Sequence, residues 1–346
     1  MSCLLLIITL TIKGVINMNI KKIGMTALAA SLVSVSANAA ELSVSGGASI
    51  NANHYSAGAD LNYGGSFTMG NAIVFSGSGE LDNGLTVSVS YELDEGAPHV
   101  SGGTFDNHSV TVSSDTLGTL VFSGHGGSSA VTKINTTAAG DIWDSFDGQL
   151  ETTNAATGVG IAEAGAGDDS FFYTLPTLMD GLAINLSYNP ANATDGGEGA
   201  YGYGATYTGI EGLTLSLATS DEETGTASTS GDTQAISVSY AYGPVTVGYT
   251  SNEHNEGKAA SANDQDVMSY SVSYTVSENL SVGYGYEEIE SGTAADQDAE
   301  YTKISASYTS GGVTLSAGFA EAENIDYSTD AKADQDYYYL GASFAF

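Results

Sequence analysis

Three Asp-Gln-Asp triplets carry the most obvious metal-binding or catalytic chemistry in the sequence. They occupy residues 264–266, 296–298 and 334–336, in the last quarter of a chain of 346 residues. Carboxylate oxygens suit Ca²⁺ and Mg²⁺, and a pair of carboxylates can also act as a general acid and base. A third interpretation is a duplicated structural unit. The elements that position the triplets decide between these interpretations.

The other candidate catalytic groups lack a functional spacing. The histidines fall in or beside five different connections, without the His-x-x-x-His spacing of a metal site, which favours exposed loop residues: His54, His99, His108, His125 and His254. No Gly-x-Ser-x-Gly elbow accompanies the many serines, although a Ser-His-Asp hydrolase stays open. We predict no catalytic residue, no enzyme activity and no cofactor, apart from Ca²⁺ or Mg²⁺ that acidic loops could bind.

The N-terminus has the pattern of a secretory signal peptide. From Met18 the chain has two lysines, an uncharged apolar stretch and the small-x-small site Ala37-Asn38-Ala39, so we predict a signal peptide over residues 1–39. Residues 1–17 lie upstream of Met18, which is the better candidate for the translation start. One interpretation is therefore that the start at Met1 is wrongly assigned. Because the single cysteine, Cys3, lies there, the secreted chain has no disulfide.

The predicted secreted chain is strongly acidic. All 41 acidic residues follow Ala40, against only four lysines and no arginine. Such a surface repels phosphate backbones and excludes nucleic acid as a partner, although the acidity could also serve solubility alone. No apolar run after the signal approaches roughly 18 residues, which excludes a helical membrane span but not a membrane barrel.

A two-residue periodicity dominates the rest of the chain. Runs such as Leu85–Tyr91 and Ser269–Tyr274 alternate apolar with small or polar residues, as strands do. Sixteen such segments begin near residues 41, 72, 85, 106, 119, 170, 181, 200, 212, 232, 244, 264, 280, 298, 313 and 334. Seven tight connections rich in turn formers alternate with eight longer, acidic ones. This pattern predicts antiparallel strands with both termini on the tight-turn side.

The polar face of these strands decides the architecture. Gly, Ser, Thr and Asn are unsuited to fill the core of a β-sandwich, whereas water can cover them inside a closed sheet whose apolar face meets lipid. We therefore predict an all-β fold: one transmembrane antiparallel β-barrel of about 16 strands over residues 40–346, with an interior wide enough for an aqueous channel.

The C-terminal strand resembles that of outer-membrane barrel proteins. Residues 337–346 end in phenylalanine with apolar residues at alternating positions, and this resemblance implies an assembly signal at Tyr338, Leu340, Phe344 and Phe346. With sixteen segments and a longest third loop, the chain is similar to the trimeric general porins of Gram-negative outer membranes. The resemblance implies short periplasmic turns, long external loops, a homotrimer in the cell outer membrane, contact with lipid and lipopolysaccharide, and recognition by the barrel assembly machinery.

The third long connection is the longest by far, from about residue 126 to 169. In the family this loop folds into the barrel and narrows it, which implies constriction residues at Asp141, Trp143, Asp144, Phe146, Asp147 and Glu151. A disordered external loop is the alternative. The family's arginine cluster, which faces this loop, cannot be carried over to a chain without arginine.

Strand parity places Glu80, Glu92, Glu287 and Lys303 on the lumen face. A mostly acidic lumen favours small cations, so we predict a passive diffusion channel for small hydrophilic solutes and ions that prefers cations. One alternative is a substrate-selective channel, for which basic or aromatic tracks along the lumen would be expected and are not evident. A structural or adhesive barrel, or a barrel enzyme, is another.

Parity also gives the triplets a position. Their aspartates face outward, and the last aspartate of each triplet lies ten residues before Val276, Tyr308 or Phe346. Ten residues of a tilted strand climb roughly 25 Å, the height of the apolar band, so the triplets lie just above that band. The aspartates are Asp264, Asp266, Asp296, Asp298, Asp334 and Asp336. We favour a solvated rim repeated with each hairpin. The alternative is a divalent-cation site shared with lipopolysaccharide.

Overall fold

The chain is almost entirely β-structure. The computed structural model describes residues 42–55, 64–94, 105–134, 136–146, 167–190, 199–223, 231–256, 264–292, 297–329 and 333–346. The first eight strands are β1 (Ser43–Tyr55), β2 (Gly64–Glu80), β3 (Thr86–Asp94), β4 (Asn107–Ser114), β5 (Gly118–His125), β6 (Ser170–Thr174), β7 (Leu182–Asn189) and β8 (Gly199–Ile210). The others are β9 (Leu213–Glu223), β10 (Gly231–Tyr242), β11 (Val245–Glu256), β12 (Gln265–Ser277), β13 (Leu280–Ser291), β14 (Ala299–Ser310), β15 (Val313–Glu323) and β16 (Gln335–Ala345). Two short 3₁₀ turns, η1 (Trp143–Ser145) and η2 (Ile325–Tyr327), complete the described elements.

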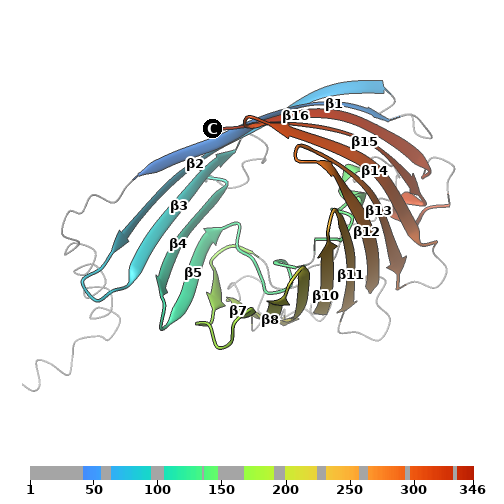
Figure 1. Ribbon diagram of the computed structural model, residues 1–346. Helices are drawn as coiled ribbons and strands as arrows, with labels where there is room; N and C mark the ends of the chain where they lie inside the picture. Colours follow the sequence, from blue (N-terminus) through green and yellow to red (C-terminus); the bar gives the residue numbers. More distant parts are fainter. Residues whose placement is uncertain are drawn as a thin grey trace, which may run out of the picture.

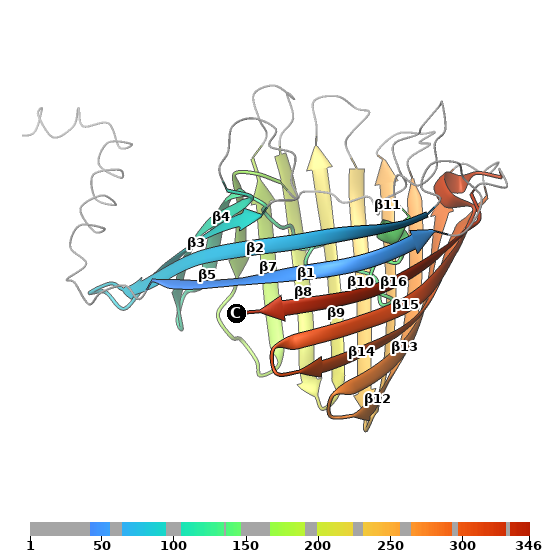
Figure 2. The ribbon, with the colours of Figure 1, turned by 90° about the horizontal axis from the view of Figure 1, so that it is seen from above.

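The strands form one closed antiparallel barrel, as predicted. Each strand pairs with its sequence neighbours, and β16 pairs with β1 to close the ring (Figure 1). The last residue takes part in this closure, because Phe346 donates its N–H to Gly46 O at 3.0 Å and accepts the Gly46 N–H at 2.9 Å. Figure 2 shows the C-terminus at this seam, beside β1. Closure satisfies the backbone groups that an open sheet edge would leave unpaired in lipid.

The two faces of the sheet differ as the alternation predicts. In β12 the outward residues Met268, Tyr270 and Val272 are exposed, whereas Val267 and Ser269, which alternate with them, are buried against the interior. Large apolar side chains therefore cover the outside and small or polar ones the inside, the arrangement that suits lipid outside and water inside. Among the described residues, no helix is long and apolar enough to cross a bilayer.

Three strand boundaries, the start of β2 and the ends of β9 and β11, differ from the sequence prediction. β2 begins at Gly64 rather than near residue 72, since residues 64–71 pair with β1 and continue the alternation through Phe67 and Met69. The glycines of this stretch resemble a loop in the sequence. β9 and β11 run on to Glu223 and Glu256, past the points near residues 220 and 252 where polar composition suggests a loop. Strand pairing continues above the apolar band, because backbone hydrogen bonds do not require apolar side chains.

The predicted signal peptide lies outside the described residues, which begin at Leu42. The predicted cleavage after Ala39 and the start at Met18 therefore stay predictions.

Candidate pore constriction

The third connection joins β5 to β6 and runs from Gly126 to Asp169. Its described residues are 126–134, 136–146 and 167–169. Figure 1 shows the segment that follows β5 passing inside the ring of strands. Four of its apolar side chains are completely or almost completely buried: Ala130, Val131, Ile142 and Phe146. For these residues the prediction of a packed loop inside the barrel is confirmed, and an external loop is excluded.

Hydroxyl groups on the inner wall bind the backbone of this constriction loop. Ala130 N–H donates to Ser187 Oγ of β7, and Ala139 N–H donates to Ser269 Oγ of β12, both at 3.0 Å. Ala138 N–H likewise donates to Thr250 Oγ1 of β11 at 3.0 Å. The loop therefore crosses the wall from β7 to β12 on side chains that accept its otherwise unpaired N–H groups.

Glycines on the wall make room for the loop. A Cβ added at Gly285 of β13 would lie 2.6 Å from Ala139 Cβ, and one at Gly248 of β11 would lie 3.2 Å from Ala138 Cβ. At Gly202 of β8 it would lie 3.2 Å from Ala130 Cβ. These separations are shorter than the normal carbon–carbon contact of about 3.5–4.0 Å. The small inward residues thus form the surface on which the loop rests.

Glu287 of β13 is the strongest single tie between wall and loop. Its side chain is 0% exposed, and Oε1 accepts the Thr137 hydroxyl and the Ile142 N–H, the latter at 2.9 Å. Its Oε2 accepts the Trp143 N–H at 3.0 Å. A buried carboxylate needs such donors to offset its lost hydration. Glu287 lies on the predicted lumen face, but the loop covers it, so it is not a charge exposed to permeating ions.

The turn above Glu287 is closed by local hydrogen bonds. Asp141 accepts the Thr137 N–H at 2.9 Å and donates its own N–H to Thr137 Oγ1 at 2.8 Å. This requires a left-handed backbone at Asp141, with φ of 47°. Lys303 of β14, also on the predicted lumen face, donates to Gly140 O at 3.3 Å and interacts electrostatically with Glu287 and Asp141. The lysine therefore helps to hold the loop.

Phe146 anchors the end of this described segment in an aromatic cluster. Its ring centroid lies 5.8 Å from that of Tyr301, 6.0 Å from that of Tyr337 and 6.3 Å from that of Tyr55. Tyr55 also donates its hydroxyl to Ser145 O at 2.6 Å. Trp143 packs against the same cluster. Edge-to-face and tilted pairs of this kind are favourable beyond the area they bury.

The remaining predicted constriction and lumen residues lie in different parts of the chain. Asp144 is exposed in η1, next to the buried Phe146, whereas Asp147 and Glu151 lie outside the described residues. Glu80 is exposed near the tight turn after β2. Glu92 accepts a hydrogen bond from Asn107 Nδ2 at 2.8 Å near the opposite end of β3. The structure therefore brings Glu287 and Lys303 together at the loop and leaves Glu80 and Glu92 apart from it.

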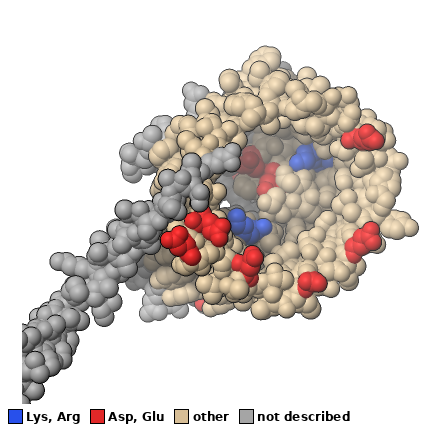
Figure 3. Space-filling view, turned by 60° about the vertical axis from the view of Figure 1, so that its left-hand side comes forward, with Lys and Arg blue, Asp and Glu red and all other residues tan. Residues whose placement is uncertain are grey.

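The interior carries both signs of charge. Figure 3 shows the hollow of the barrel with lysine and acidic atoms inside its opening. The structure describes two lysines: Lys303, and Lys133 on the constriction loop, whose ammonium lies 5.6 Å from the Phe172 ring centroid. Lys133 was not among the lumen residues predicted from the sequence. Its position within the predicted inward loop is the feature from which it could have been predicted.

The predicted rim aspartates lie at the starts of strands whose even-numbered residues face outward. Asp266 is exposed beside Met268 and Tyr270, and Asp336 shares the outward parity of Tyr338. Asp264, Asp298 and Asp334 precede these strands, and Asp296 lies outside the described residues. Within the part of the chain that the structure describes, no group of three or more His, Cys, Asp or Glu side chains could hold a metal ion. Cation binding at the rim stays a prediction.

Sequence reasoning missed most of the acidic residues on this outer face. Cross-strand partners there are repeatedly both acidic: Glu253 with Asp266, Asp266 with Glu290, Glu288 with Glu300, Glu300 with Glu323, and Glu321 with Asp336. We call these residues the carboxylate belt. Register decides these pairs, and register is what the sequence alone did not provide.

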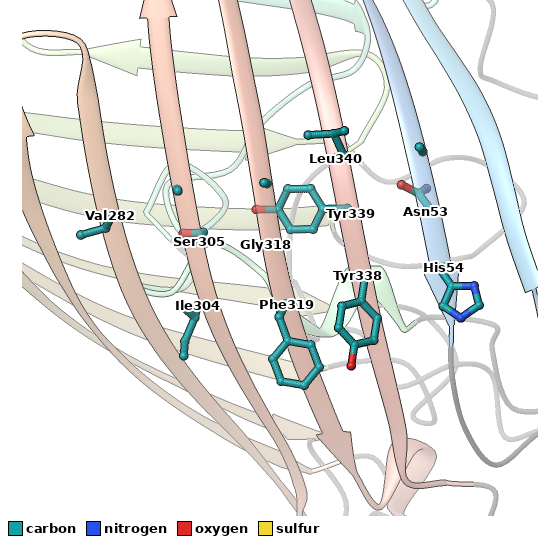
Figure 4. Close-up of a pocket in the computed structure, with 13 residues that line it drawn as sticks. Asn53, His54, Val282, Ile304, Ser305, Gly318, Phe319, Tyr338, Tyr339 and Leu340 are labelled. Carbon is teal, nitrogen blue, oxygen red and sulfur yellow. The ribbon is translucent and has the colours of Figure 1, made fainter.

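The predicted assembly signal lies on the outward face of β16. Tyr338, Leu340, Phe344 and Phe346 are 45%, 62%, 40% and 75% exposed. Tyr338 and Leu340 also line an apolar groove of about 600 Å³ across β13 to β16 and β1, together with Ile304 and Phe319 (Figure 4). Its outward, mostly apolar lining suits lipid contact. Recognition of the strand by assembly machinery stays a prediction.

Fold and site together define a transmembrane channel whose lumen is narrowed by its third connection. A family profile described as Gram-negative porin matches residues 24–300 and 249–346. The chain therefore belongs to the Gram-negative porin family and forms a diffusion channel of the outer membrane. No curated protein sequence matches it.

Solved structures of two porins and of a further outer membrane protein share the fold at low sequence identity. The anion-selective porin from Comamonas acidovorans is 17% identical, with 89% of this chain and 100% of that chain covered, at a TM-score of 0.67. A porin refined at 1.8 Å resolution is 19% identical over 88% and 100% of the two chains, at 0.63. A loop L8 deletion mutant of OmpT, an outer membrane protein of Vibrio cholerae, is 15% identical over 89% and 100%, at 0.61.

Proposed function

We propose that this porin passes small hydrophilic solutes and ions by passive diffusion and prefers cations to anions. The observation that supports this preference is the charge of the groups open to the lumen. Asp144 is exposed on the constriction loop and Glu80 on the inward face of β2. Of the two described lysines only Lys133 is exposed, whereas Lys303 donates to Gly140 O and interacts electrostatically with Glu287 and Asp141. An acidic pore lining attracts cations and repels anions.

A potassium chloride gradient across a planar bilayer tests the preference. We expect a reversal potential whose sign shows that potassium is more permeant than chloride, and a smaller potential for Asp144→Asn. The matched control is Asp115→Asn, which removes an exposed carboxylate from the tight turn after β4. A reversal potential that favours chloride contradicts cation preference, and absence of conductance contradicts the channel itself.

Anion preference is the second candidate, because the Comamonas acidovorans porin is described as anion-selective. The exposed Lys133 on the constriction loop is the observation in its favour. The same reversal potential decides between the two, and Lys133→Gln would weaken an anion preference.

The expected partners follow from family membership. Gram-negative porins are generally trimers in the outer membrane, and we infer a homotrimer in contact with lipid and lipopolysaccharide and inserted by the barrel assembly machinery. We also infer that the chain is not an enzyme. Electrophoresis of unheated, detergent-extracted protein tests the trimer, since a stable trimer migrates at about three times the mass of the monomer and a monomer does not.

A further inference from the structure

One tyrosine on the inner wall lies over a glycine of the neighbouring strand. Tyr339 of β16 faces the lumen, because the even-numbered Tyr338 and Leu340 face outward. A Cβ added at Gly318 of β15 would lie 2.5 Å from Tyr339 Cε1 and 2.7 Å from its Cζ. Figure 4 shows the ring reaching from β16 to Gly318. The glycine thus lets the ring rest on the sheet, and the half-buried ring keeps part of its surface toward the lumen.

This ring continues the aromatic cluster of the constriction. Tyr339 stacks on Tyr337, with ring centroids 5.7 Å apart and an interplanar angle of 24°. Tyr337 in turn contacts Phe146 of the constriction loop. Tyr337 belongs to the set packed against the buried core, whereas Tyr339 does not. Tyr339 therefore lies beside the constriction, with a ring outside the cluster that the described part of the loop forms with the wall.

The strands around Tyr339 present neutral polar side chains to the lumen. Its row across the sheet consists of Ser305, Gly318, Tyr339, Asn53 and Ser66 on β14, β15, β16, β1 and β2. Residues directly opposite each other in an antiparallel sheet share a face. Among these described positions, none is charged, so the ring's own row offers hydroxyl and amide groups. The row on its other side holds Tyr337, Ala320 and Lys303.

The next row toward the tight turns repeats this chemistry. It consists of Ser307, Ser316, Gly341, Asn51 and Thr68 on the same strands. The Asn51 amide oxygen and the Ser316 hydroxyl lie 2.5 and 2.8 Å from where a Cβ at Gly341 would be. An amide and a hydroxyl therefore converge one row below the Tyr339 ring, again over a glycine.

We propose that Tyr339 and these two rows form a transit binding site for neutral, ring-shaped, polyhydroxylated solutes, of which sugars are the natural class. The apolar C–H face of a pyranose can stack on the exposed part of the ring, while its hydroxyls exchange hydrogen bonds with Asn51, Ser316 and their neighbours. Aromatic surface with a few placed polar groups is the usual composition of a site for such a ligand. Binding must be weak enough for release, as conduction requires. This inference rests on the proposed function as a diffusion channel.

Ion-current analysis in planar bilayers tests the site, with maltose as the ring-shaped probe and mannitol as an acyclic polyol. We expect maltose to reduce the current saturably and mannitol to act only weakly. Tyr339→Ala should raise the half-blocking maltose concentration about threefold to tenfold, the range that follows from aromatic contact energies. Tyr339→Phe, which keeps the ring, should stay within about twofold of the native channel. The matched control is Tyr284→Ala, an outward tyrosine of β13.

Each outcome tests either the sugar site, the stacking on Tyr339 or the channel function. Normal conductance without saturable block by maltose overturns the sugar site and leaves the channel intact. Equal block by maltose and mannitol overturns stacking on Tyr339, as does an unchanged half-blocking concentration in a Tyr339→Ala channel of normal conductance. A native protein that conducts no ions overturns the proposed function instead. The shift in migration between heated and unheated samples verifies that each variant is folded.

Discussion

Glu287 joins the barrel wall to the constriction loop through a single carboxylate. It accepts the Thr137 hydroxyl and two consecutive loop N–H groups, those of Ile142 and Trp143. Leaving a buried donor unpaired costs about 1–3 kcal/mol, and removal of Glu287 would leave three such donors. Glu287 therefore makes more hydrogen bonds to this turn of the loop than any other described wall side chain.

We predict that Glu287→Ala releases the turn and increases open-channel current noise several-fold, because a loop without this tie samples more positions across the lumen. Glu287→Gln should have a smaller effect. Its amide oxygen still accepts hydrogen bonds from the loop, whereas its NH₂ group, which replaces the second carboxylate oxygen, accepts none. Single-channel recording measures both. Glu290→Gln, an exposed position on the outer side of the same strand, is the control. Unchanged noise in a folded Glu287→Ala channel would show that other contacts suffice to hold the loop.

The sequence located this residue but not its role. Strand parity was sufficient to orient Glu287 and Lys303 toward the lumen, because two-residue alternation is a local property. Their partners are not local: Thr137 and Glu287 are 150 residues apart. Without the path of the loop, Glu287 had the same appearance as Glu80, an exposed acid at a strand end.

The constriction loop depends on small residues in the strands beneath it. Gly285 allows Ala139 to approach β13 until a Cβ on the glycine would be 2.6 Å away. A methyl group there has to push the loop away from the wall, toward the centre of the lumen, by roughly 1 Å to reach normal contact distance. The glycine is thus needed for close approach, and its φ is unexceptional.

We predict that Gly285→Ala lowers single-channel conductance, because the displaced loop moves toward the centre of the lumen, and destabilises the barrel by about 1–3 kcal/mol through overpacking. Conductance recording and the temperature of the electrophoretic unfolding transition measure these effects. The matched control is Gly283→Ala on the same face of β13, where the nearest atom would be 3.4 Å away. A Gly285→Ala protein indistinguishable from the control would mean that the loop adapts without cost.

The order and number of elements could be predicted, but not all of their ends. Alternation and turn chemistry are local signals, and they predicted sixteen strands and the seven tight turns between them. The start of β2 was wrong because Gly64, Gly65 and Gly70 carry no side chain that shows the alternation. A strand stabilised by pairing with β1 on one side needs no such pattern to form.

At the scale of the whole molecule, the closed barrel could be predicted from the sequence, because the strands have an apolar face that only lipid could cover and a polar face that only water could fill. The aromatic path from Phe146 to Tyr339 did not follow, because its residues come from β1, β14, β16 and the loop. The carboxylate belt likewise depends on the register of six strands, from β11 to β16. The register between strands is therefore the part of the structure that could not be predicted from the sequence.

The carboxylate belt predicts that the barrel becomes more stable as ionic strength rises. Like charges directly opposite each other in a sheet are destabilising, by roughly 0.2–1 kcal/mol per pair before solvent screening, and pairs such as Glu300 with Glu323 recur across the belt. Because the Debye length falls from about 30 Å at 0.01 M to about 3 Å at 1 M salt, sodium chloride should raise the unfolding temperature. Glu300→Gln with Glu321→Gln should reduce this gain, and Asp115→Asn should not.

Calcium chloride at matched ionic strength separates screening from binding. Replacement of the six triplet aspartates by asparagine should leave any extra effect of calcium unchanged if the rim is merely solvated, and should abolish it if the rim binds calcium.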